Sequence, residues 1–137
     1  MRSILGVATV VLVLLVLPNA TALGSPSRGS DTSSLRHRLV LSSPSIVAGD
    51  TEHAVEVARN DHPFPVEAWV SWVVTFPCGG GLIGDPVTQT MPANGGVARW
   101  RLDVATSSDC VGTYTVQTTI TDRHGSGQDE KTFDATP

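Results

Sequence analysis

The sequence has few charged and few aromatic residues. Charged side chains make up 16% and aromatic side chains 5% of its 137 residues, and Lys131 is the single lysine. So low a charged fraction excludes a coiled coil and an acidic disordered chain. The formal net charge of −4 also argues against nucleic acid or an anionic membrane as a partner. The length is enough for one globular domain and too short for two.

Familiar catalytic and metal-binding motifs are also missing. The sequence contains neither Gly-x-Ser-x-Gly nor Cys-x-x-Cys, the patterns of serine hydrolases and of many zinc sites. Its four histidines are widely spaced, and we interpret them as solvated surface side chains: His37, His53, His62 and His124. We therefore expect a protein that is not an enzyme and needs no metal or cofactor. Five aspartates fall in expected turns and leave a calcium site as an open question: Asp50, Asp61, Asp85, Asp109 and Asp122.

One long apolar run is present, close to Met1. Ile4–Leu17 carries no charge and follows Arg2, and the small residues Ala20-Thr21-Ala22 come shortly after it. This order is typical of a secretory signal peptide over 1–22, because the run is shorter than the ~20 residues of a spanning helix. An uncleaved membrane anchor is the alternative. After cleavage we expect a secreted or periplasmic protein without membrane contact.

The rest of the chain divides into a leader and one domain. Residues 23–34 are rich in Ser, Gly and Pro and predict a flexible leader. Residues 35–137 show apolar residues with a period of two, which predicts strands. The strand segments are expected over Leu39–Leu41, Ser45–Ala48, Thr51–Ala58, Val66–Phe76, Pro86–Met91, Val97–Val104, Gly112–Thr121 and Gln128–Asp134. With the first two counted as one strand interrupted by Pro44, the pattern predicts a seven-stranded β-sandwich that ends in an edge strand.

Alternation within single strands assigns the two faces of the sheets. In Val66–Phe76 every second residue from Val66 is apolar and should face the core, Trp72 among them. In Thr51–Ala58, two valines share one face and two glutamates the other. Val97–Val104 points Trp100 inward and its arginines outward.

An exposed tryptophan on a sheet suits protein contact or sugar stacking. Trp69 and Val73 are expected on the outer face of Val66–Phe76, beside outward polar residues of Gly112–Thr121. The candidate binding face is therefore Trp69, Val73, Thr115, Gln117 and Thr119. The alternative is that a loop or the leader covers Trp69.

The two cysteines, Cys78 and Cys110, are expected to form a disulfide if the chain is exported. Cys78 follows the third strand of the sandwich, and Cys110 precedes the sixth. In an immunoglobulin-type sandwich these strands are antiparallel neighbours, so the two positions meet at one end. Two free thiols or a metal pair are the alternatives, although no histidine lies within ten residues of either cysteine.

Short motifs resemble immunoglobulin-like domains. The stretch Asp109–Val116 (DCVGTYTV) is similar to the start of strand F, and its Gly-x-Tyr matches a tyrosine corner. Trp72 matches the core tryptophan of strand C, and Thr121–Gly125 is similar to a turn in bacterial immunoglobulin-like modules. The resemblance covers residues 39–134 and implies a Greek-key sandwich in which the Tyr114 phenol bonds the backbone. The usual disulfide between strands B and F is absent.

We expect a secreted, non-enzymatic binding module whose partner is a protein or a cell-surface glycan. One alternative is a secreted inhibitor of a protease or another hydrolase, acting through a loop over residues 77–85 with Leu82 and Ile83 at its tip. The other is a periplasmic-type metal carrier that uses its histidines.

Overall fold

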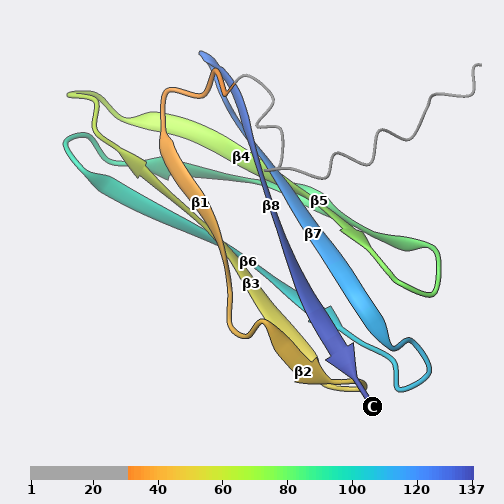
Figure 1. Ribbon diagram of the computed structural model, residues 1–137. Coiled ribbons are helices and arrows are strands. Elements are labelled where there is room, and N and C mark those ends of the chain that lie inside the picture. The colour runs from red at the N-terminus through yellow and green to blue at the C-terminus, as the bar shows by residue number, and fades with distance from the viewer. Residues whose placement is uncertain (1–30) are drawn as a thin grey trace, which may run out of the picture.

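The computed structural model describes residues 31–137, so the expected signal peptide and leader residues 23–30 lie outside the described part. Two sheets pack face to face, which confirms the all-β sandwich (Figure 1). One sheet has the strand order β1-β3-β6, and the other has the order β2-β8-β7-β4-β5. The strands are β1 (Arg36–Leu41), β2 (Ser45–Val47), β3 (Thr51–Asn60), β4 (Val66–Thr75), β5 (Gly81–Met91), β6 (Gly96–Ala105), β7 (Gly112–Asp122) and β8 (Gly125–Thr136).

The last strand, β8, is not the bare edge that the sequence predicts. Its final residues pair in parallel with β2, in the register Ser45 with Asp134 and Val47 with Thr136. Figure 1 shows the C-terminus lying beside β2. Pro44 separates β1 from β2, so the interrupted first strand contributes one segment to each sheet. The remainder of β8 pairs with β7 alone among the strands.

Strand β5 is longer than the sequence predicts, and this corrects the expected loop over residues 77–85. Gly79 and Gly80 have φ values of 96° and 75°, which a residue with a Cβ adopts at a cost. They close a tight turn, so the chain re-enters the sheet at Gly81, opposite Thr75. The register shifts between Val70 and Trp72, because β5 has one residue more than β4 there. This bulge contains Pro86, which has no N–H for a ladder hydrogen bond.

The core confirms the alternation expected of β4, β6 and β7. Every second residue of β4 from Val66 to Val74 is buried, and Trp72 keeps only 3% of its surface exposed. Trp100 on β6 and Tyr114 on β7 are buried as well. The tyrosine corner is also present, because the Tyr114 hydroxyl donates to the Cys110 carbonyl at 2.9 Å. Aromatic side chains from β4, β6 and β7 therefore fill the space between the sheets.

Strand β3 buries its acidic face and leaves its valines half-exposed. Glu52 and Glu56 are both fully buried. Glu52 Oε1 accepts hydrogen bonds from the Ser42 backbone N–H at 2.6 Å and from the Ser42 hydroxyl at 2.7 Å. Glu56 accepts from the Thr118 hydroxyl on β7 at 2.8 Å. A buried carboxylate needs hydrogen bonds. Ser42, which follows β1, and Thr118 on β7 provide them, so the glutamate side of β3 can face the core.

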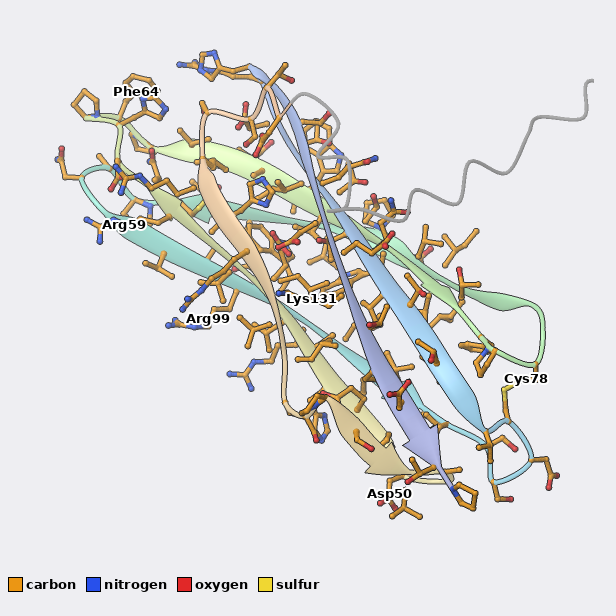
Figure 2. The ribbon with its side chains drawn as sticks, viewed as in Figure 1. Asp50, Arg59, Phe64, Cys78, Arg99 and Lys131 are labelled. Atoms are coloured by element: carbon orange, nitrogen blue, oxygen red, sulfur yellow. A yellow bond between two sulfur atoms is a disulfide. The ribbon has the colours of Figure 1, made fainter. Side chains whose placement is uncertain are left out.

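The predicted disulfide between Cys78 and Cys110 is present, with its Cα atoms 5.4 Å apart. It joins the end of β4 to the segment before β7, and these two strands are antiparallel neighbours. Figure 2 shows Cys78 at the end of the sandwich opposite Phe64. The bond therefore links two segments at one end of the five-stranded sheet and does not connect the two sheets through the core.

Candidate functional site

The outer face of the five-stranded sheet brings together all five residues of the candidate binding face. Trp69 and Val73 lie on β4 with 38% and 43% of their surfaces exposed. Val73 is directly opposite Gln117 on β7. Thr115 and Thr119 are also on β7, two residues before and two residues after Gln117. No other segment of residues 31–137 covers Trp69 to the point of burial, so the expectation of an exposed tryptophan holds for the described chain.

The structure adds residues from the two flanking strands. On β5, Ile83 lies opposite Val73 and Thr88 lies opposite Trp69. Ile83 is the most exposed large apolar residue of the described chain, at 79%. On β8, Glu130 continues the row of Val73 and Gln117. These contributions were missed because β5 has no clear alternation and β8 carries few apolar residues.

The chemistry of this face is nearly neutral and rich in hydrogen-bonding groups. From the row of Thr75 to the row of Trp69, its paired polar side chains are hydroxyls and amides apart from Glu130 (Ser71, Thr75, Thr88, Thr115, Gln117, Thr119, Thr121, Ser126, Gln128 and Thr132). Asp85 is exposed in the β5 bulge between Ile83 and Thr88 and adds a second carboxylate at this edge of the face. The apolar surface is supplied by the Trp69 indole, Val73 and Ile83. We call this surface the Trp69 face. It offers one flat aromatic ring among donors and acceptors that carry little charge.

The structure does not place Leu82 and Ile83 at the tip of a loop. Both are in β5, opposite Val74 and Val73, so their side chains point to opposite sides of the sheet. The connection between β4 and β5 is short and is held by two backbone hydrogen bonds between Phe76 and residues 79–80. The protruding loop on which the inhibitor interpretation depended is therefore absent from the described chain.

His37 is not a solvated surface residue, and this corrects the sequence interpretation. Its side chain is only 4% exposed. Its Nδ1 lies 2.9 Å from Glu56 Oε1, and its Nε2 lies 2.9 Å from Asp31 Oδ2. Both ring nitrogens face carboxylates, so both donate when the ring is protonated. The hydrogen bond to Glu56 is the main reason that the pKa of His37 is raised above its ordinary value, against the opposing effect of burial.

The other histidines and the turn aspartates make separate local contacts. His53 pairs with Asp103 at 2.6 Å, and the His62 ring stacks on Phe64. Asp122 accepts hydrogen bonds from Ser33 and from the backbone of Ser34 and His124. Burial alone would raise the pKa of Asp122, but these hydrogen bonds hold it below its ordinary value. Within residues 31–137, no three His, Cys, Asp or Glu side chains are placed to hold a metal ion.

The contacts of Asp122 also fix the start of the domain. Residues 31–34, which the sequence assigned to the flexible leader, lie against the turn between β7 and β8. Thr32 exchanges hydrogen bonds with Ser126. No helix in residues 31–137 has the length and apolar character needed to cross a membrane.

Comparison with known proteins gives similarity in fold alone. No protein-family model and no curated protein sequence matches the chain. The CARDB domain of the PF1109 protein from Pyrococcus furiosus, in complex with di-metal ions, is similar over 74% of this chain and 85% of that one (TM-score 0.52, 11% identity). The fold is immunoglobulin-like.

Immunoglobulin-like sandwiches similar to this one also form parts of longer microbial enzymes. The alkylpurine DNA glycosylase AlkC of Pseudomonas fluorescens, bound to DNA containing an abasic-site analogue, matches over 75% of this chain and 30% of its own length (TM-score 0.59, 12% identity). A family 123 glycoside hydrolase from Clostridium perfringens matches over 67% of this chain and 22% of its own (TM-score 0.54, 11% identity). This chain thus spans less than a third of either enzyme.

Proposed function

We propose that this protein is a secreted, non-enzymatic binding module whose Trp69 face takes a neutral glycan. The exposed indole among hydroxyl and amide side chains carries the proposal. The C–H face of a sugar ring packs on an indole, while its hydroxyls exchange hydrogen bonds with Ser, Thr and Gln side chains. A protein partner is less well suited, because the apolar surface of this face is limited to the Trp69 indole and the adjacent pair of Val73 and Ile83.

Two observations support the secreted part of the proposal. The Cys78–Cys110 disulfide suits an oxidising compartment. The apolar run Ile4–Leu17 followed by Ala20-Thr21-Ala22 has the order of a cleavable signal. N-terminal sequencing of the exported protein should find Leu23 as the first residue. A membrane-bound product that retains Met1 would contradict this part.

Cosedimentation with insoluble polysaccharides tests the glycan part. Purified protein is mixed with cellulose, chitin or peptidoglycan, and bound protein is measured as a function of polysaccharide concentration. We expect binding to at least one of the three, weakened about tenfold or more by Trp69→Ala, which corresponds to about 1.4 kcal/mol. Trp69→Phe should retain part of the affinity, because it keeps an aromatic ring.

Val111→Ala serves as the matched control, because Val111 is exposed to a similar extent, at 45%, and lies in the segment between β6 and β7. Its affinity should equal that of the unchanged protein. If the unchanged protein binds none of the three polysaccharides, or if Trp69→Ala binds as well as the control, the Trp69 face is not a glycan site.

A further inference from the structure

The outer face of the three-stranded sheet is basic, whereas the Trp69 face is nearly neutral. Its outward residues include five of the nine lysines and arginines of a chain whose net charge is −4. They come from all three strands: Arg36 and Arg38 from β1, Arg59 from β3, Arg99 and Arg101 from β6. All five are exposed. Figure 2 shows Arg59 and Arg99 projecting away from the sandwich on the side of this sheet.

The register places these arginines around valines. Arg38, Val57 and Arg99 form one cross-strand row, because Val57 pairs with both arginines. In the next row Arg59 lies between Arg36 and Val97, and in the row on the other side Val55 lies between Val40 and Arg101. We call these nine residues the arginine face. Val57 thus lies at the centre of the face, with an arginine opposite it on each neighbouring strand.

A shallow hollow of about 280 Å³ lies within the arginine face. Val57 and Val97 provide its apolar lining, and four arginine side chains surround them (Arg36, Arg38, Arg59 and Arg99). The two valines give the hollow an aliphatic floor. A ligand that fills this hollow therefore combines an apolar group with negative charges on either side of it.

The arginines are incompletely neutralised within the described chain. Asp61 pairs with Arg36 at 3.1 Å and with Arg59 at 2.6 Å. Arg38, Arg99 and Arg101 form no ion pair with any residue of 31–137. Arg36 and Arg59 are the two arginines of this face that lie directly opposite each other, and Asp61 offsets their repulsion. The charges of Arg38, Arg99 and Arg101 remain available to an anionic partner.

We propose that the arginine face binds an acidic polypeptide segment that places an aliphatic side chain in the hollow between its carboxylates. Arginine forms two hydrogen bonds to a carboxylate and is enriched in protein interfaces, where lysine is depleted. An extended peptide repeats its side chains every second residue, as the face does. Purely charged polymers use the arginines and leave the valines in contact with water. This site is separate from the Trp69 face, which lies on the opposite side of the sandwich.

Fluorescence anisotropy with a labelled peptide of alternating Glu and Val residues tests the proposal. We expect saturable binding that weakens about tenfold or more between about 0.05 M and about 0.5 M salt, since screening acts on exposed charges. Arg38→Glu combined with Arg99→Glu should weaken binding at least about tenfold. Val57→Ala should weaken binding less than this, without changing the salt dependence.

The matched control compares Arg123→Glu with Arg99→Glu, which change the net charge equally; Arg123 is an exposed cation in the turn between β7 and β8, outside the arginine face. Lys131 is left unchanged, because it lines a hollow together with Arg38 and Val40. The affinity of Arg123→Glu should stay within about twofold of the unchanged protein. Thermal melts of all variants establish that each is folded at the temperature of the binding measurement.

Four outcomes overturn the proposal. The first is that the peptide does not bind, and the second is that Arg123→Glu weakens binding as much as Arg99→Glu does. In the third, a peptide of Glu alone binds as tightly as the Glu-Val peptide, so the hollow is unused. In the fourth, another polyanion binds more tightly than the peptide, whether heparin fragments, duplex DNA or phosphatidylglycerol vesicles. If the variant with both Arg38→Glu and Arg99→Glu no longer binds that polyanion, the arginine face is a site for it and not for the peptide.

Discussion

Trp69 and Trp72 are three positions apart on β4 and have opposite environments. Trp72 is packed between the sheets. Gly84 on β5 lies so close to it that a Cβ added at Gly84 would be 3.1 Å from the Cβ of Trp72. Trp69 lies on the outer surface with 38% of its area exposed. The same residue type therefore serves stability at one position and is available for binding at the other.

Replacing each tryptophan by alanine should separate these roles. Trp72→Ala should lower the free energy of unfolding by about 3–5 kcal/mol, because it leaves a cavity in the core. Trp69→Ala should change the free energy of unfolding by no more than about 0.5 kcal/mol. Urea denaturation of both variants measures the difference. Equal large losses would mean that Trp69 is buried against another part of the protein.

His37 connects the two sheets through a chain of polar contacts. Asp31 and Glu56 bond its two ring nitrogens, and Glu56 also accepts from Thr118 on β7. A buried carboxylate without these partners would be costly. The polar contacts thus fix how β1 and β3 sit over the five-stranded sheet.

This contact predicts that stability falls as the pH is raised from acidic to neutral values and above. The folded pKa of His37 is raised above its ordinary value of 6.5. Its contribution is therefore fully present below about pH 6.5 and is lost as the pH rises through the folded pKa. Thermal melts from about pH 5.5 to about pH 8.5 should show this decline, and His37→Gln should remove it.

The effect of the raised His37 pKa on stability can be distinguished from the effect of the lowered Asp122 pKa. A lowered carboxyl pKa adds stability above its unfolded value of 3.8, and this stability is lost only at lower pH. The two effects therefore fall in different pH ranges. A decline in His37→Gln as steep as in the unchanged protein, between pH values of about 6 and 8, would contradict the assignment to His37.

At the scale of elements, the turn between β4 and β5 and the segment before β7 form one cross-linked unit. The disulfide joins them, and the Tyr114 hydroxyl bonds the carbonyl of Cys110 itself. Cys78→Ser combined with Cys110→Ser should lower the free energy of unfolding by roughly 3–4 kcal/mol, as the chain-entropy model gives for a 32-residue separation. Urea denaturation under oxidising conditions measures this loss. The same loss should appear when the unchanged protein is reduced, and an unchanged midpoint after complete reduction would contradict it.

The strands that could be predicted from sequence are those whose buried side is apolar. β4, β6 and β7 alternate clearly because each has one side in the core and the other in water. β5 could not be delimited, because it is an edge strand with most of both its sides exposed. Which side of β3 faces the core depends on partners outside the strand. His37 is on β1, Ser42 follows β1, and Thr118 is on β7. Local alternation carries no information about such partners.

At the scale of the whole molecule, the two outer faces differ in how far they could be foreseen. The Trp69 face follows from alternation within two strands, and the structure brings its predicted residues together. The arginine face needs the register of three strands, so Arg36, Arg59 and Arg99 become neighbours only in the folded sheet. The net charge of −4 conceals this face, because most of the acidic residues lie outside it and only Asp61 forms ion pairs with its arginines.

The pairing of β2 with β8 has a consequence for how the protein is made. Ile46 and Thr136 are 90 residues apart in the chain and bond each other in the folded state. At roughly 5–20 residues per second of synthesis, β2 waits on the order of 5–20 s for its partner strand. During that interval the five-stranded sheet lacks β8, and Tyr114 of β7 lacks the Phe133 ring on which it stacks. Folding of this domain is therefore completed after synthesis of its last strand, and the nascent chain needs protection from aggregation until then.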